Sequence, residues 1–124
     1  MNQVTRAIIG CAMKVHSILG PGLLESAYEA CLAYELRKAG FEVKCQVELP
    51  VVYDGVRLDV GYRIDLLVND NVVVELKCVE QITPLHEAQI ISYLKLSKKR
   101  VGLLINFHVL HLKSGIKRFI EGTD

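Results

Sequence analysis

The stretch RIDLLVNDNVVVELKC, residues 63–78, decides the fold, because two apolar runs flank the polar sequence Asn-Asp-Asn at 69–71. Asparagine and aspartate favour turns, and the runs on either side consist mainly of branched aliphatic residues that suit strands. A strand that is apolar on both faces is typical of the interior of a sheet. The sequence therefore predicts a buried hairpin. Glu75 and Lys77 interrupt it, although charged side chains are rarely buried without a partner.

The register of this hairpin predicts a pair of acids. Side chains alternate along a strand, so Glu75 and Lys77 share one face. In a three-residue loop Val68 pairs with Val72, and the same register places Asp65 directly opposite Glu75. Directly opposed side chains lie about 4.5–5.5 Å apart at Cβ, and two carboxylates at that distance repel each other.

Two explanations for this pair stay open. A hard divalent cation such as Mg²⁺ binds one or two carboxylates and keeps several waters, one of which Lys77 would orient or deprotonate. Alternatively Arg63, which lies opposite Lys77 in the same register, completes a self-neutralising cluster of two acids and two bases. The spacing alone fits both a metal site and an ion-pair cluster.

The segments before the hairpin predict two helices and a strand. Residues 3–19 carry apolar side chains at spacings of three and four, which is typical of an amphipathic helix, and Gly-Pro-Gly at 20–22 ends it. A second helix is expected from Leu23 to Ala39, and the glycine after it favours a helix C-terminus. Residues 41–49 alternate strictly between apolar and polar, which predicts a half-buried strand.

Further signals predict the remaining elements. Asp-Gly at 54–55, between VVY and VRL, predicts a two-residue hairpin turn. Thr83 and the proline after it favour the start of a third helix that reaches about Lys98. The apolar run 101–106 suits a central strand, and 107–112 is a candidate for another. The order α-α-β-β-β-α-β predicts an α/β fold with a mixed sheet flanked by helices.

The composition predicts one domain spanning residues 1–124. Hydrophobic residues make up 51% of the chain, and this surplus leads us to expect a homodimer, the commonest oligomer. No apolar run approaches the roughly 20 residues of a membrane helix, and the N-terminus lacks a signal-peptide pattern, so we expect a cytoplasmic protein without membrane contact. The four cysteines include no CxxC pair, which favours reduced core thiols. A net charge of +1 does not by itself indicate a nucleic-acid binder.

Three motifs carry a resemblance to a known family. IDLLVNDNVVVELKC matches the D-(x)n-E-x-K signature of the PD-(D/E)XK nuclease superfamily. GLLESAY, with Gly22, Glu25 and Tyr28, resembles the motif of the GxxExxY family within that superfamily, and VHSILGP precedes it as is usual there. QIISY, with Gln89 and Tyr93, resembles the QxxxY element found on the next helix of many members. The resemblance covers nearly the whole chain and implies a restriction-endonuclease-like α-β-β-β-α-β core with an extra N-terminal helix.

The resemblance also implies a role for each residue of the motifs. Asp65 and Glu75 correspond to the metal ligands, with the backbone carbonyl of Leu76 as a third. Lys77 corresponds to the catalytic lysine. Glu25 corresponds to an acid on a helix that completes the site through metal or water.

These roles predict a nuclease that hydrolyses phosphodiester bonds of DNA or RNA with a metal-activated water, using Mg²⁺ with Mn²⁺ as a substitute. Gln89 would orient Lys77 or a phosphate. Phosphate contacts from the basic residues at the end of the third helix would add affinity without sequence information. The alternative is a catalytically silent nucleic-acid-binding or regulatory module on the same fold. The expected substrate-binding residues are Tyr93, Lys95, Lys98, Lys99 and Arg100.

Overall fold

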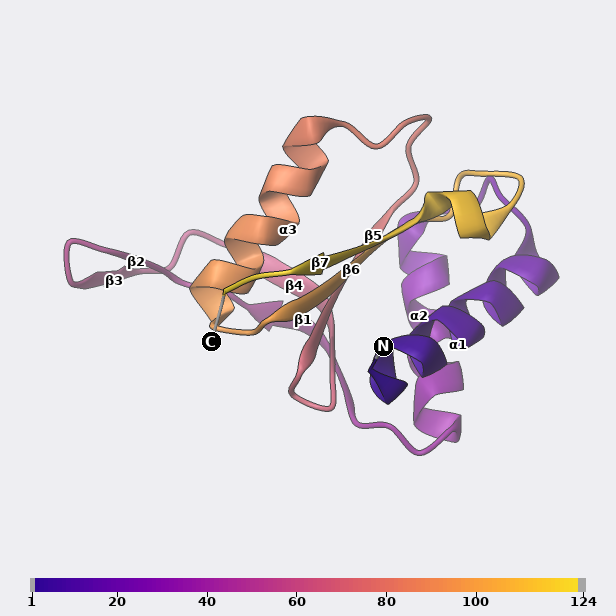
Figure 1. The fold of residues 1–124 in the computed structure, drawn as a ribbon, viewed down its shortest axis with the longest axis horizontal. Coiled ribbons are helices and arrows are strands. Elements are labelled where there is room, and N and C mark those ends of the chain that lie inside the picture. The colour runs from indigo at the N-terminus through magenta and orange to yellow at the C-terminus, as the bar shows by residue number, and fades with distance from the viewer. Residues whose placement is uncertain (1, 123–124) are drawn as a thin grey trace.

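The computed structural model describes residues 2–122, and within them a five-stranded sheet lies between two layers of helices. Helices α1 (Gln3–Leu19) and α2 (Glu25–Lys38) cover one face, and α3 (Pro84–Ser97) covers the other (Figure 1). The strands run in the order β1-β4-β5-β6-β7, and β5 and β6 are parallel whereas the other pairs are antiparallel. This mixed α/β sheet confirms the predicted fold class. The strands are β1 (Val43–Glu48), β4 (Arg63–Val68), β5 (Val72–Lys77), β6 (Val101–Asn106) and β7 (Ile116–Ile120).

Two short strands lie apart from this sheet. β2 (Val51–Tyr53) and β3 (Val56–Leu58) form a separate two-stranded ribbon that projects from the body of the molecule (Figure 1). Tyr53 pairs with Val56 across the Asp-Gly turn, so the predicted two-residue hairpin is confirmed. Both turn residues have positive φ, which is the conformation that such a tight hairpin requires.

Polar side chains fix the starts of two helices. The Asn2 side chain accepts hydrogen bonds from the backbone N–H groups of Val4 and Thr5 at the start of α1. Thr83 caps α3 by accepting from His86 N–H, while His86 Nδ1 accepts from Thr83 N–H in return. These bonds satisfy backbone groups that a helix N-terminus leaves unpaired. The predicted start of α3 at Thr83 and Pro84 is thereby confirmed.

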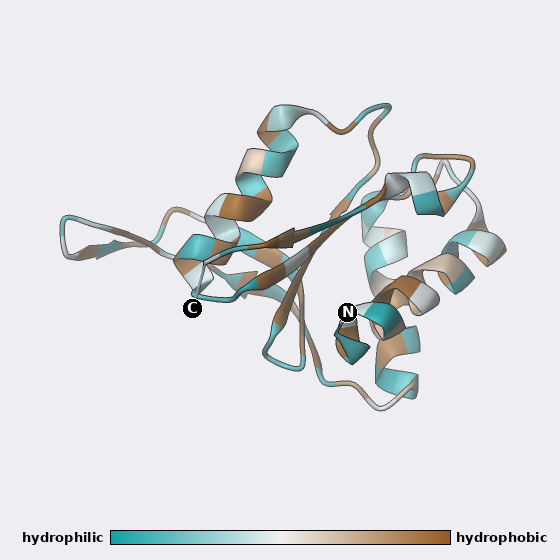
Figure 2. Ribbon diagram, viewed as in Figure 1, coloured by the Kyte–Doolittle hydropathy of each residue, from teal (hydrophilic) through white to brown (hydrophobic). Residues whose placement is uncertain are grey.

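Each face of the sheet has its own hydrophobic core. The larger cluster joins α1 and α2 to the sheet, and the smaller one joins α3 to the opposite face. In Figure 2 the inner strands β5 and β6 are mostly brown, whereas the helices carry brown on part of their surface only. Burying one Val or Leu side chain stabilises the folded state by about 1.5–3 kcal/mol. The buried strands β5 and β6 therefore contribute strongly to the stability of the sheet.

The predicted strand at 41–49 differs from the observed β1 in one respect. Val43 packs with the α1–α2 cluster, but Val47 and Leu49 pack with the α3 cluster, although strict alternation would place all three on one face. The change occurs at Gln46, whose φ of 54° lies in the left-handed region. Cys45, expected in the core, is exposed.

The candidate strand at 107–112 was a wrong prediction. β6 ends at Asn106, whose side chain accepts a hydrogen bond from Val79 N–H at 3.1 Å and donates one to Val79 O at 2.8 Å. The same Asn106 oxygen accepts from His108 N–H at 3.2 Å, which turns the chain away from the sheet. A 3₁₀ helix at Leu112–Gly115 follows, and the last strand is β7.

Candidate active site

The predicted register of the β4–β5 hairpin is confirmed as far as its ladder extends. Val68 pairs with Val72, and Leu66 pairs with Val74, as a three-residue loop requires. The ladder stops there, one pair before Asp65 would face Glu75. The two strands part at this point, while β5 continues its parallel pairing with β6 as far as Lys77.

The two acids replace the missing ladder with bonds of their own. Asp65 N–H donates to Glu75 Oε2 at 2.9 Å, and Leu76 N–H donates to Asp65 Oδ2 at 2.9 Å. Each carboxyl group is therefore held by the backbone of the opposite strand. This arrangement fixes the two acids next to each other, as the register predicted, and leaves one oxygen of each without a backbone bond.

Burial changes the acidity of Glu75. Its residue is 4% exposed, and this burial, with the charge of Asp65, raises the pKa of Glu75 to about 8. The hydrogen bond from Asp65 N–H and the charge of Lys77 act in the opposite direction. A strongly raised carboxyl pKa beside a second acid is typical of a functional site, because a bound cation would offset the cost of both charges.

Glu25 belongs to the same electrostatic group. It is the first residue of α2, and partial burial followed by the charge of Asp65 raises its pKa, while the charge of Lys77 lowers it. The structure thus brings Glu25 into the electrostatic reach of both the acid pair and the lysine. This placement agrees with the position that the sequence motif implied for Glu25.

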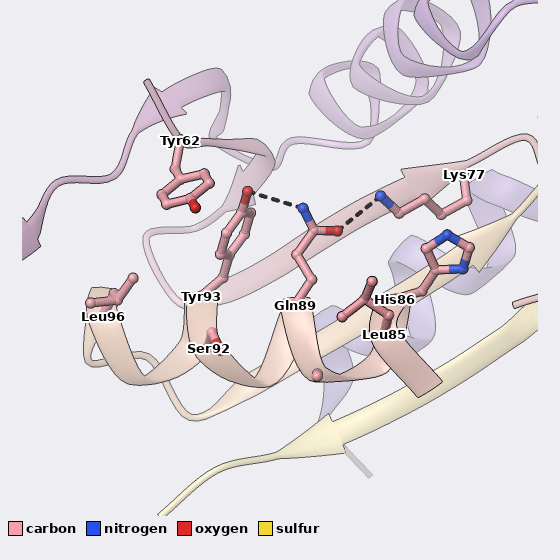
Figure 3. Close-up of a pocket in the computed structure, with 9 residues that line it drawn as sticks. Tyr62, Lys77, Leu85, His86, Gln89, Ser92, Tyr93 and Leu96 are labelled. Atoms are coloured by element: carbon pink, nitrogen blue, oxygen red, sulfur yellow. Dashed lines mark hydrogen bonds between the residues drawn. The ribbon is translucent and has the colours of Figure 1, made fainter. Parts of the chain in front are cut away.

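Lys77 is oriented by a chain of two hydrogen bonds. Its Nζ donates to Gln89 Oε1 at 2.9 Å, and Gln89 Nε2 donates to Tyr93 Oη at 3.2 Å (Figure 3). Gln89 and Tyr93 lie one turn apart on α3 and point towards the end of β5. Gln89 therefore contacts Lys77, one of the two partners that the sequence analysis expected for it, and its part in catalysis stays a prediction.

The alternative ion-pair cluster is not formed. Arg63 pairs with Glu48 on β1, with 3.9 Å between Nη2 and Oε1, and both side chains are exposed. Among the ion pairs of residues 2–122, none joins Arg63 or Lys77 to either acid of the pair. The separation of β4 from β5 explains this, because the pairing that would set Arg63 opposite Lys77 does not extend that far.

Two residues that the sequence analysis did not identify lie near Asp65: Gln46 bonds to it, and Glu29 bonds to Gln46. Gln46 Nε2 donates to Asp65 Oδ1 at 3.2 Å and to Glu29 Oε1 at 2.7 Å. Glu29 follows Glu25 by four residues on α2, so the two acids share a helix face, and that spacing was a usable signal. Burial is the main cause that raises the pKa of Glu29. Gln46 gave no signal, because its contact depends on the left-handed φ of the kink.

The donor set fits a hard cation that keeps most of its water. Within residues 2–122, no group of three His, Cys, Asp or Glu side chains is arranged to hold a metal ion. The two adjacent carboxyl groups of Asp65 and Glu75 are hard oxygen donors, and Mg²⁺ typically takes one or two such groups and several waters. Glu25 would then act through water.

The basic residues at the end of α3 lie away from this site. Lys99 Nζ pairs with Asp70 Oδ1 at 3.4 Å, in the loop that precedes β5. Lys77 is the last residue of β5, so roughly 17 Å of strand separates the two positions. Lys95 is in the last turn of α3, and Lys98 caps the helix in the left-handed region. Their role in substrate binding therefore stays a prediction.

The fold and this site together define a restriction-endonuclease-like α/β protein, with two acids and a lysine where two central strands part. The model of one family, the PD-(D/E)XK nuclease superfamily, matches residues 2–119, and the chain belongs to that superfamily. Comparisons with curated proteins and with solved structures gave no match. Nucleases of this superfamily generally use divalent metal ions, and their substrate is nucleic acid. Of the helices described, none has the length and apolarity needed to cross a membrane.

Proposed function

We propose that this chain is a Mg²⁺-dependent nuclease, active also with Mn²⁺, that hydrolyses phosphodiester bonds of DNA or RNA. The observation that carries the proposal is the adjacent pair formed by the half-buried Asp65 carboxyl and the buried Glu75 carboxyl, each held by one backbone N–H group, beside a lysine held by Gln89. Groups fixed in this way lose little freedom when a reacting phosphate binds. Superfamily membership supports the same reaction class.

Each residue has a proposed part in the reaction. Asp65 and Glu75 would hold the cation, with the Leu76 carbonyl as a further ligand. A bound divalent cation lowers the pKa of its water and stabilises the charge that develops on the phosphate. Lys77 would orient that water and stabilise charge, and Gln89 would keep the Lys77 ammonium aimed at it. Glu25, which lies within electrostatic reach of Asp65 and Lys77, would accept a proton from the attacking water.

We propose further that the chain is of the GxxExxY type, and the structure suggests what that motif does. Tyr28 is fully buried and stacks on Phe107 with 4.4 Å between ring centroids. Its hydroxyl accepts a hydrogen bond from Leu23 N–H at 3.1 Å and donates to Gly20 O. The tyrosine therefore holds the turn from which α2 begins, and so fixes the position of Glu25.

Cleavage assays test the proposed activity. Purified protein is incubated with Mg²⁺ or Mn²⁺ and end-labelled single-stranded and double-stranded DNA and RNA. We expect cleavage of at least one substrate, and a loss of about 100-fold or more in Lys77→Ala, as is usual when a positioned catalytic group is removed. Asp65→Asn serves as the control that removes a ligand with little change in shape. If wild type cleaves no substrate faster than the two variants do, the proposal is overturned. If the protein instead binds nucleic acid without metal, and Asp65→Asn does not change that binding, the chain is a silent binding module.

We also propose a homodimer of single-domain subunits that acts in the cytoplasm. Four free cysteines agree with a reducing compartment. The surface that supports a dimer is the ribbon β2–β3 with the residues after it, because an isolated two-stranded ribbon is marginally stable in water. Five large apolar side chains of this surface are exposed by 42% or more: Val52, Tyr53, Val56, Leu58 and Val60.

A further inference from the structure

A groove extends from the proposed catalytic lysine along one side of α3. It encloses about 640 Å³ between this helix and the segment that joins β3 to β4 (Figure 3). Lys77 and Gln89 line one end of the groove, and Tyr62, Tyr93 and Leu96 line the other. Binding sites for organic ligands typically enclose about 300–1,000 Å³, so the groove has room for a nucleotide. It is continuous with the proposed active site, since Lys77 and Gln89 belong to both.

The far end of the groove presents an aromatic surface. The Tyr62 ring leans on the Tyr93 ring with 5.9 Å between centroids and 53° between planes. Tyr93 is 6% exposed and bonded to Gln89, so it is fixed, whereas Tyr62 is 48% exposed. The backbone of Tyr62 is nevertheless anchored, because its carbonyl accepts from Leu49 N–H at 2.8 Å. An exposed aromatic ring on an anchored backbone offers a face on which another ring can stack.

Positive charge continues beyond the aromatic end. Lys95 lies in the last turn of α3, next to Leu96 in the chain, and Lys98 caps the helix. Both residues are exposed. Proteins that bind single strands combine an aromatic platform for bases with positive groups along the backbone. The groove provides the aromatic feature, and the exposed lysines at the end of α3, the helix that lines the groove, provide the positive one.

We propose that this groove binds an unpaired nucleobase stacked on Tyr62, with the phosphate to be cleaved at Lys77. Paired bases inside a duplex are already stacked on their neighbours, so their faces are not available to Tyr62. The substrate class is therefore single-stranded nucleic acid or a nucleotide extruded from a duplex. This inference rests on the proposed nuclease function for its cleavage step, but the binding step requires neither metal nor turnover.

Fluorescence measures that binding step directly, because the chain contains no tryptophan. Tyr62→Trp introduces the single tryptophan of the chain at the proposed platform, where it can be excited selectively over the tyrosines. The probe is an oligothymidylate of about 12 nucleotides in EDTA, within known site sizes for single-strand binding. We expect saturable quenching and a smaller effect from a duplex of the same length. The matched control is Tyr34→Trp, an exposed position on α2 across the sheet, where no quenching is expected.

Affinity measurements with the native residues complete the test. Tyr62→Ala should weaken oligothymidylate binding about 5- to 150-fold, which corresponds to the stacking free energy of one base. Tyr62→Phe, which keeps the ring, should bind as wild type does, and duplex binding should be unchanged in both variants. Equal binding of oligothymidylate by wild type and Tyr62→Ala overturns the groove proposal, even if the protein is an active nuclease. Quenching and selective binding without any cleavage support the groove and overturn the proposed nuclease function instead.

Discussion

At the scale of single residues, the carboxyl group of Glu75 has the least favourable surroundings in the site. It is buried next to a second acid, and Lys77, whose charge lowers its pKa, is hydrogen-bonded to Gln89 instead. The loop length alone predicted that Asp65 and Glu75 would be neighbours. It could not predict that the ladder breaks beside them, because the break depends on the backbone bonds that their own carboxylates accept.

The raised pKa of Glu75 predicts a pH dependence of stability in the metal-free protein. Its pKa is about 8 in the folded state and near the ordinary value of 4.5 when unfolded. Between these values the folded state binds a proton that the unfolded state has lost, so the free energy of unfolding falls as pH rises from about 4.5 to about 8. We expect Glu75→Gln to reduce this fall. Urea denaturation of both proteins in EDTA at pH 5 and pH 8 measures it.

The comparison between wild type and Glu75→Gln removes the titration of Glu75 and its coupling to Glu25. Glu29 also has a raised pKa, but it titrates in both proteins and is not among the groups that shift Glu75. Its contribution therefore cancels when the pH-dependent changes of the two proteins are subtracted. Equal changes in wild type and variant would show that the Glu75 carboxyl does not carry the predicted proton.

Replacing Asp65 tests whether the acid pair is built for a cation. In Asp65→Asn the side-chain oxygen can still accept from Leu76 N–H, and at a pH above about 8, where Glu75 is ionised in the metal-free protein, the repulsion between the two carboxylates, about 0.2–1 kcal/mol for opposed like charges, disappears. We expect the metal-free variant to be at least as stable as wild type. Mg²⁺ at tenfold above its Kd should stabilise wild type by about 1.4 kcal/mol and leave the variant unaffected. Thermal melts with EDTA or millimolar Mg²⁺ measure both effects, and a destabilised variant with no Mg²⁺ response in either protein would contradict the metal site.

At the scale of secondary structure, sequence patterns predicted most helices and strands, because in those segments the local pattern of apolar and turn-forming residues determines the structure. Helical spacing and the Gly-Pro-Gly stop gave α1 as observed at Gln3–Leu19. Where a tertiary contact competes with the local pattern, the prediction was wrong. The apolar-rich residues 107–112 do not continue as a strand, and at their start Asn106 bonds to Val79 and to the following chain. The alternation of 41–49 is interrupted because Gln46 adopts φ 54°.

The kink in β1 is the element-scale feature that supports the site, and a pair of variants tests it. Gln46→Ala and Gln46→Gly both remove the amide that bonds Asp65 and Glu29. Glycine adopts positive φ freely, whereas alanine pays about 1–2 kcal/mol in the left-handed region. We expect Gln46→Gly to be more stable than Gln46→Ala by about 1 kcal/mol in urea denaturation, with nuclease activity lowered to a similar extent in both. Equal stability of the two variants would show that the chain straightens at this position when the amide is removed.

At the scale of the whole molecule, the fold was predictable because the two hydrophobic faces of the sheet dictate two helical layers. The apolar strands β5 and β6 must be covered on both faces. Helices α1 and α2, which precede the sheet in the chain, cover one face, and α3, which connects β5 to β6, covers the other. The composition also indicated more apolar surface than one subunit buries. The sequence did not show where that surface lies, because strands β2 and β3 read as ordinary hairpin strands. Their exposure follows from the two strands pairing only with each other and projecting from the sheet (Figure 1).

The projecting ribbon therefore carries the prediction about assembly. If two subunits pack their ribbons together, Val52, which is 63% exposed in one subunit, becomes buried in the dimer. Light scattering should then give twice the mass of the chain at micromolar concentration. Val52→Lys should give the mass of one chain, because twofold symmetry places the unfavourable lysine in the interface twice, and each buried valine contributes about 1.5–3 kcal/mol. The matched control is Ile18→Lys, at a position 68% exposed on α1, which should remain dimeric. A wild-type protein that scatters as a single chain contradicts the dimer, and a Val52→Lys protein that stays dimeric assigns the contact to another surface.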